Sequence, residues 1–235
     1  MSTRIDEIAD GIYRISTPST VVPGGFTFNQ FLIVDEEPLI FHTGLRKMFP
    51  VVKEAIARVM PVEKLKYIAF SHVEADESGA LNDFLAVAPN SVPVCSQTAA
   101  MVSINDLADR APRALADGET LRLGRHTVQW HDTPHLPHSW ESGLMTETST
   151  KTFLCGDLFT HAGADLPPVT EGDILGPSEG VRAAMNYYSQ AGDASVMLRK
   201  LSTFKPRTLA LMHGSSWHGD GEKLINALAD LLAKS

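Results

Sequence analysis

The first third of the chain consists of short apolar runs separated by polar turns, a pattern typical of a β-meander. The run Gly11–Ile15 predicts a strand. Two longer runs, Phe26–Val34 and Pro38–His42, flank the polar turn Asp35-Glu36-Glu37 and predict a hairpin. We therefore expect antiparallel pairing in this part of the chain.

Helical spacing appears next, because apolar residues recur every three or four positions after Pro50, which is tolerated near a helix start. Ser78 is predicted to cap a second helix. The elements predicted here are a helix with Val52, Ala55, Ile56 and Val59 on its apolar face, a strand at Tyr67–Phe70, a helix carrying Leu81, Phe84 and Leu85, a strand at Val92–Cys95 and a helix from Thr98 to Asp109.

The second half repeats this order of strands followed by helices. We expect strands at Glu119–Leu123, Thr127–His131, Leu144–Glu147, Thr152–Cys155 and Thr208–Met212, a loop from Thr160 to Pro177, a long helix from Ser178 to Phe204 broken near Gly192, and a last helix from Glu222 to Ala233. Two similar halves, each a sheet covered by helices, indicate an α/β fold. A four-layer sandwich is one option, formed by a single domain over residues 1–235.

Composition narrows the classes of function. The chain has 235 residues, a formal charge of −8 and a pI near 5.5, which disfavours charge-driven binding of nucleic acid or anionic lipid. It shows neither a membrane-spanning run nor a signal-peptide core, so we expect a cytoplasmic protein. Two cysteines are too few for a disulfide scaffold.

The first chemical signal is the segment His72-Val73-Glu74-Ala75-Asp76, directly after a predicted strand. In extended backbone, alternate side chains point the same way, so these three polar side chains could converge. Two carboxylates and an imidazole held together favour a bound cation. A solvated acidic loop that caps the following helix explains Glu77 and Ser78 equally well, so this segment alone leaves both interpretations open.

Four further polar segments follow predicted strands, where a sheet presents accessible side chains at fixed positions. They are His42-Thr43-Gly44, the run His131 to His138, Gly156-Asp157 and Met212-His213-Gly214. A single histidine or aspartate at a strand end is usually a turn residue. The repeated placement makes a metal site the better interpretation.

The ordered set H-x-E-x-D, His, Asp and His-Gly resembles the metallo-β-lactamase superfamily. With Glu74 at its second ligand position, it resembles the di-iron branch of flavodiiron and oxygen-binding di-iron proteins. Other matching pieces are Phe28–Val34, Thr43-Gly44, Leu154–Phe159, the Tyr187-Tyr188 pair on the late helix and Met212–Ser215. The resemblance covers nearly the whole chain and implies an αββα four-layer sandwich.

The resemblance also implies a ligand set. His72, Glu74 and His138 would bind a first iron, Asp157 would bridge, and Asp76 with His213 would bind a second iron. His131 and His135 compete with His138 and rank well behind it.

One position departs from the family motif, since Glu77 stands where a second histidine often follows the aspartate. Glu77 could ligate through oxygen, hydrogen-bond a ligand, or leave an open metal position. His161, Tyr187 and Tyr188 are further candidates for contacts behind the ligands.

Three imidazoles and three carboxylates suit two iron ions (Fe–Fe) better than zinc, with manganese also less expected than iron. The 22 residues after His213 are too few for a flavodoxin domain, so we expect no FMN in this chain and a separate electron donor. A homodimer is plausible for this fold.

Three functions remain open. The leading one is an oxidoreductase that binds or reduces dioxygen, with nitric oxide as an alternative. The second is a binuclear metal-dependent hydrolase of an ester, thioester or phosphodiester. The third is an oxygen sensor that is not an enzyme.

Overall fold

A computed structural model describes residues 2–234, whose strands form two seven-stranded sheets. The first sheet follows chain order. Its strands β1 to β4 are antiparallel, and β4 to β7 are parallel. They are β1 (Arg4–Ala9), β2 (Ile12–Ser19), β3 (Phe26–Ile33), β4 (Leu39–Phe41), β5 (Tyr67–Ala69), β6 (Val92–Ser96) and β7 (Arg113–Leu115).

The second sheet has the order β12-β14-β13-β11-β10-β9-β8. Its strands are β8 (Thr120–Arg122), β9 (Thr127–Asp132), β10 (Gly143–Glu147), β11 (Thr152–Leu154), β12 (Val169–Thr170), β13 (Thr208–Ala210) and β14 (Ser216–His218). Because β11 and β13 pair in parallel, the loops that follow them leave the same edge of the sheet.

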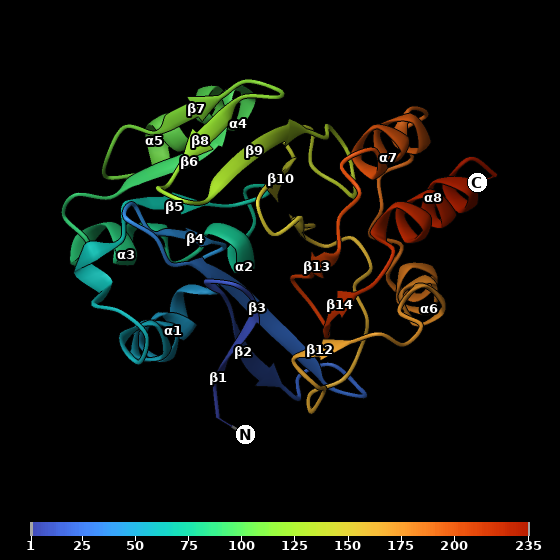
Figure 1. The fold of residues 1–235 in the computed structure, drawn as a ribbon, viewed down its shortest axis with the longest axis horizontal. Coiled ribbons are helices and arrows are strands. Elements are labelled where there is room, and N and C mark those ends of the chain that lie inside the picture. Colours follow the sequence, from blue (N-terminus) through green and yellow to red (C-terminus); the bar gives the residue numbers. More distant parts are fainter. Residues whose placement is uncertain (1, 235) are drawn as a thin grey trace.

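Helices cover both outer faces of this pair of sheets. In Figure 1, α1 and α3 lie on one side, and α6, α7 and α8 lie on the opposite side. The helices are α1 (Phe49–Ala57), α2 (Ala75–Ser78), α3 (Leu81–Val87), α4 (Gln97–Ala99), α5 (Asn105–Leu107), α6 (Leu175–Met185), α7 (Ala194–Ser202) and α8 (Gly221–Leu232). The predicted αββα four-layer sandwich is confirmed.

The core fills the three spaces between these four layers. Successive side chains of a strand point to opposite faces, so Leu32 packs against the outer helices while Phe31 and Ile33 pack between the sheets. Across the sandwich, Leu154 faces the middle layer and Phe153 faces α7 and α8. These runs are apolar throughout because both faces of the sheets are buried.

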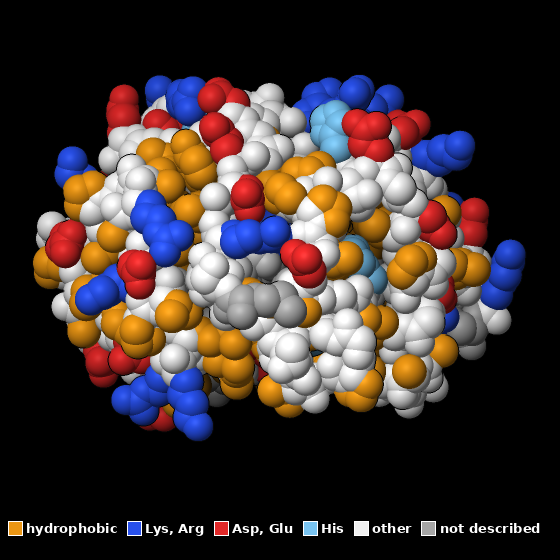
Figure 2. Space-filling view, turned by 90° about the horizontal axis from the view of Figure 1, so that it is seen from below, with side chains coloured by type: hydrophobic (Ala, Val, Ile, Leu, Met, Phe, Trp, Pro, Cys, Tyr) orange, Lys and Arg blue, Asp and Glu red, His pale blue; other side chains and the backbone are white. Residues whose placement is uncertain are grey.

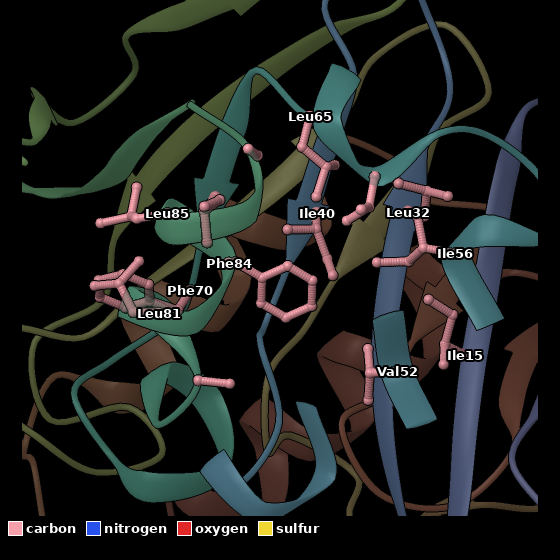
Figure 3. Packing of buried hydrophobic residues seen from close by; sticks show 14 of the residues in the cluster. Ile15, Leu32, Ile40, Val52, Ile56, Leu65, Phe70, Leu81, Phe84 and Leu85 are labelled. Atoms are coloured by element: carbon pink, nitrogen blue, oxygen red, sulfur yellow. The ribbon is translucent and has the colours of Figure 1, made fainter. Parts of the chain in front are cut away.

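Figure 3 shows the outer layer of the first sheet, where Phe84 of α3 and Val52 and Ile56 of α1 pack with Ile40 and Leu32. All five side chains are fully buried. Each such side chain contributes about 1.5–3 kcal/mol on transfer from water. The apolar face predicted for residues 52–59 is thus the contact surface of α1.

The predicted helix from Ser178 to Phe204 is wrong in one respect. Helix α6 ends where Asn186 takes a left-handed conformation (φ 49°), and α7 begins only at Ala194. The interruption is wider than a break near Gly192, because the left-handed residue stops the helix eight positions before α7. Tyr187 and Tyr188 therefore lie in the α6–α7 connection and not on a helix.

Other local predictions need correction. Ser78 ends α2, donates its hydroxyl to the Glu74 carbonyl and does not cap α3. The predicted loop over residues 160–177 contains β12 and the start of α6. The strands missed from sequence are β1, β7, β12 and β14, of which the first three lie at sheet edges, where partly exposed side chains weaken the apolar pattern.

Within the described residues, no helix is long and apolar enough to cross a membrane. Figure 2 shows one face of the surface, on which acidic, basic and apolar side chains are interspersed. A broad field of one sign is not seen on that face.

Candidate metal centre

The polar loops predicted to carry ligands meet at one edge of the sandwich. Backbone hydrogen bonds join the two sheets there, since the Gly143 amide donates to the Ser71 carbonyl (2.8 Å) and the Asn29 amide donates to the Met212 carbonyl (2.9 Å). The segments after β5, β11 and β13 are thereby brought together. The structure places all six predicted ligands in two neighbouring groups.

The first group contains His72, Glu74, His138 and Asp157. His72 Nε2 lies 2.9 Å from His138 Nε2 and 3.1 Å from Glu74 Oε2. His138 Nε2 lies 3.4 Å from Asp157 Oδ2. These separations suit donor atoms around one ion, because histidine nitrogens and carboxylate oxygens bind an ion such as Zn²⁺ at about 2.0–2.2 Å.

The second group contains Asp76, Glu77 and His213. His213 Nε2 lies 3.3 Å from Asp76 Oδ2 and 3.3 Å from Asp157 Oδ1. Asp157 thus turns one carboxylate oxygen to each group. A carboxylate placed in this way would contact an ion bound in either group.

The first segment does not converge on a single point as the alternation predicted. Glu74 is extended (φ −136°, ψ 166°), but Ala75 begins α2, so Asp76 and Glu77 lie in a helical turn. Helical backbone rotates successive side chains by about 100°. His72 and Glu74 consequently face the first group, while Asp76 faces His213.

Each histidine of the two groups is oriented through its Nδ1 atom. His138 Nδ1 donates to the Tyr187 carbonyl (3.1 Å), and His213 Nδ1 donates to the Thr27 carbonyl (2.8 Å). His72 Nδ1 lies 2.9 Å from Ser71 Oγ. These contacts leave all three Nε2 atoms available inside the groups, the arrangement found around metal-binding histidines.

His42 extends this arrangement behind His72. It is fully buried, with Nε2 3.1 Å from Ser71 Oγ and Nδ1 3.0 Å from Met212 Sδ. Burial lowers the pKa of His42 to about 3, so the ring is neutral at pH 7. The sequence placed His42 after a strand but assigned it no role; the structure shows that it holds the Ser71 hydroxyl.

Charges in the two groups perturb one another. Hydrogen bonds from His138 and His72 lower the pKa of Glu74 to about 2. Burial opposes protonation of His213, but the carboxylates of Asp157 and Asp76 raise its pKa to about 9. Burial together with the neighbouring Asp157 and Asp76 carboxylates holds the pKa of Glu77 well above its usual range.

His161 lies behind the second group and does not belong to it. Its Nδ1 donates to the Phe159 carbonyl (3.0 Å), and its Nε2 accepts from the Ser215 amide (3.0 Å). Its ring also covers Gly214 (φ 99°), where an added Cβ would clash with the imidazole. Both ring nitrogens are therefore used to hold the loop that carries His213.

The two tyrosines have different surroundings. Tyr187 donates its hydroxyl to the Asp157 carbonyl (3.0 Å) and lies edge-on to His138. Tyr188 packs against the Tyr187 ring and lies 5.7 Å from the Arg182 guanidinium. Tyr187 is thus in contact with the ligand groups, and Tyr188 supports it from behind.

The competing histidines lie away from both groups. His131 is buried, lies 2.9 Å from Thr146 Oγ1 and packs against Phe204. His135 is exposed in a left-handed conformation (φ 64°). The preference for His138 in the sequence agrees with this placement.

A small cavity of about 150 Å³ opens onto the two groups. Besides the proposed ligands, it is lined by Phe26, Thr160, Met185 and Tyr187. Phe26 stacks on the His213 ring with centroids 4.2 Å apart. Sequence reasoning missed Phe26, Thr27 and Met185 as site residues; the alternation Phe26-Thr27-Phe28 showed only that a strand was present.

The donor set fits a pair of cations. Four carboxylates lie close together, and Asp157 and Glu77 are almost completely buried. Asp157 Oδ1 and both Glu77 carboxylate oxygens are buried without a hydrogen-bond partner among the described residues. Buried carboxylates in this state are strongly unfavourable unless a cation compensates them.

The fold defines a metallo-β-lactamase-fold protein, and its two neighbouring groups of His, Asp and Glu are candidate ligands for metal ions. The family model described as "ODP family beta lactamase" matches residues 26–177, and the chain belongs to this family. Among solved structures, the metal-soaked Flv1 flavodiiron core from Synechocystis sp. PCC6803 superposes with a TM-score of 0.84 at 18% identity, covering 99% of this chain and 61% of that one.

Two curated relatives have names that describe activities. Rubredoxin-oxygen oxidoreductase of Megalodesulfovibrio gigas is 31% identical over 144 residues, which cover 60% of this chain and 35% of that protein. Nitric oxide reductase of Moorella thermoacetica is 24% identical over 245 residues, covering 94% of this chain and 60% of that protein. The chain thus spans about a third to three fifths of these relatives.

Proposed function

We propose that the chain holds a non-haem di-iron centre and binds or reduces dioxygen, with nitric oxide as a second diatomic substrate. The first iron would be held by His72, Glu74 and His138, and the second by Asp76 and His213. Asp157 would be shared between them. The names of the two curated relatives support this class of substrate.

The observation that carries the proposal is the shared Asp157 between two groups whose histidines all present Nε2. The set of three imidazoles and three carboxylates is rich in oxygen donors. Such sets favour iron or manganese, whereas structural zinc sites use mainly histidine and cysteine. Bound iron would supply redox chemistry that no side chain of this set provides.

The cavity size favours a diatomic substrate over the hydrolase alternative. Pockets for organic ligands usually measure about 300–1,000 Å³. The cavity over this centre is about 150 Å³, and Phe26, Met185 and Tyr187 restrict it. These side chains leave little room for bulky esters or phosphodiesters.

The chain's own groups keep the ligands in place. Carbonyls of Thr27 and Tyr187 fix two imidazole rings, and the Tyr187 hydroxyl fixes the backbone at Asp157. Such contacts behind the ligands typically change metal affinity by about 10–100-fold. The site is therefore preorganised before an ion binds.

Electron supply separates an oxidase from a sensor. Reduction of dioxygen to two waters consumes four protons from solvent and four electrons, which a one-electron or two-electron reductant must deliver. Without such a donor, the centre would hold oxygen without turnover and could signal its presence. We favour the oxidoreductase because both named relatives are reductases of diatomic gases by name.

Elemental analysis of protein expressed with iron, followed by anaerobic reduction and oxygen titration watched by absorbance, tests the proposal. We expect about two irons per chain and a new absorbance band on adding oxygen. Decay of the band with excess reductant indicates an oxidase, and its persistence indicates a sensor.

Asp157→Asn is the control, since it changes one oxygen of the shared carboxylate to an amide nitrogen and removes the charge. This variant should hold one iron or fewer and show no oxygen-dependent band. Two zincs, no oxygen response and hydrolysis of a phosphodiester or thioester panel would contradict the proposal and support the hydrolase.

A further inference from the structure

Glu77 is the least satisfied carboxylate of the described chain. Its side chain is 1% exposed, and neither carboxylate oxygen has a hydrogen-bond partner within residues 2–234. Glu147 provides the contrast, because it is equally buried but accepts from the backbone amides of Ser149 (2.9 Å) and Thr150 (2.7 Å). The charged form of a buried carboxylate without donors is strongly unfavourable unless a cation lies beside it.

The position of Glu77 is fixed by its own backbone. Its carbonyl accepts from the Thr43 amide (2.7 Å) and the Thr43 hydroxyl (3.2 Å). From this anchor the side chain enters the space between the two ligand groups. Glu77 Oε2 lies 3.8 Å from His72 Nε2, and the carboxylate also groups with Asp76 and His213.

We propose that Glu77 is itself a metal ligand, the fourth carboxylate of the centre, and that it binds the second ion beside Asp76 and His213. The inference rests on the proposed binuclear centre. Two divalent ions bring four positive charges, and Glu74, Asp76, Asp157 and Glu77 balance all four. With Glu77 excluded, the three remaining carboxylates would leave one of the four positive charges without a balancing side chain in the two groups.

Ligation by Glu77 also determines which metal the second position prefers. The position then has one imidazole among carboxylate oxygens, a donor set suited to the harder ions Mn²⁺ and Fe²⁺. An imidazole in place of Glu77 would move the preference toward Zn²⁺. Glu77 would therefore determine which metal ion the second position prefers.

A ligand and a structural residue respond differently to mutation. If Glu77 is a ligand that accepts no hydrogen bond in the metal-free protein, Glu77→Gln removes no contact there, so the metal-free protein stays at least as stable as the wild type. If Glu77 supports the fold, the same variant destabilises the metal-free protein. A metal ion that binds only the folded state raises the Tm. The gain in Tm on adding metal therefore measures how much Glu77 contributes to metal binding.

The experiment uses anaerobic titration of the metal-free chain with Mn²⁺ and, separately, Zn²⁺, followed by calorimetry and by thermal unfolding. The variants are Glu77→Gln, Glu77→His and the matched buried control Glu147→Gln. We expect Glu77→Gln to bind the second Mn²⁺ about tenfold or more weakly. It should also keep or raise the metal-free Tm and lose part of the metal-induced gain in Tm.

We expect Glu77→His to bind two ions with a preference shifted toward Zn²⁺, and Glu147→Gln to bind Mn²⁺ as the wild type does. A second Mn²⁺ bound equally tightly by Glu77→Gln, or a metal-free variant less stable than the wild type, would overturn the assignment of Glu77 alone. A wild-type chain that binds fewer than two ions would instead refute the proposed binuclear function.

Discussion

The two ligand groups differ in how far they are open to solvent. In the first group, Glu74 has a side chain 54% exposed and His138 one 21% exposed. In the second group, Asp76 is 16% exposed, His213 7% and Glu77 1%. Asp157 belongs to both and is itself 8% exposed.

This difference sets the energetics of the metal-free protein. Glu74 accepts hydrogen bonds from two histidines and reaches water, so its charge is well compensated. Glu77 is almost completely buried and has no hydrogen-bond donor among the described residues, and burial raises the free energy of its charged form. The closed group therefore depends more on a cation than the open group does.

The largest expected effect comes from removing what the two groups share. Asp157→Asn takes a charge from both groups, so we expect metal content to fall from about two ions to one or fewer, with affinity lowered by about 100-fold or more. Elemental analysis after anaerobic loading measures this. Asp106→Asn, at an exposed position in α5, should keep both ions; full loading of Asp157→Asn would show that the groups do not share this carboxylate.

The next prediction separates the groups. Asp76→Asn should weaken the second ion more than Glu74→Gln weakens the first, because water can replace the exposed Glu74 carboxylate but cannot easily enter beside Asp76. We expect about tenfold or more for Asp76→Asn and a few-fold for Glu74→Gln. Stepwise titration with Mn²⁺ resolves the two losses, and equal losses would remove the distinction between open and closed groups.

The open group was easier to predict from sequence than the closed one. His72 and Glu74 lie in or near extended backbone after β5, where alternation of side chains applies. Asp76 and Glu77 follow one residue into α2, and their direction depends on a helical turn that four residues of sequence do not specify. The αββα order was readable because each buried strand and each amphipathic helix leaves its own hydrophobic pattern.

Site residues that come from a distant strand could not be predicted from the sequence. Thr27 and Phe26 contact His213, which lies more than 180 positions later, and neither carries a charge or a motif. Their role exists only after the two sheets pack together. Resemblance to the di-iron branch supplied the order of ligands, but not these contacts behind them.

A third prediction tests support of the closed group from behind. His161→Phe keeps a ring over Gly214 but leaves the Ser215 amide without its acceptor. An unsatisfied buried donor costs about 1–3 kcal/mol, so unfolding in urea should show a loss of this size. Binding of the second Mn²⁺ should weaken a few-fold while the first is unchanged, and an equal loss at both ions would mean that His161 supports the fold as a whole.

The last prediction concerns His131, a buried histidine outside both groups. It shows how burial changes a histidine pKa when no ligand carboxylate is in contact. Burial lowers the pKa of His131 to about 4, below the ordinary 6.5. The unfolded chain therefore binds a proton more readily between these values. Stability contributed by the neutral ring is present above about pH 6.5 and is lost as pH falls toward 4, with a slope of at most about 1.4 kcal/mol per pH unit.

His131→Gln should remove this slope from the difference between urea unfolding curves taken near pH 7 and near pH 5. The change is expected with or without metal, because His131 contacts Thr146 and Phe204 and neither is a proposed ligand. Identical slopes in variant and wild type would show that folding does not shift the pKa of His131. In His213 the pKa shift has the opposite direction, because the neighbouring carboxylates raise the pKa to about 9. Comparing His131 with His213 therefore distinguishes the effect of burial on a histidine pKa from the effect of nearby charges.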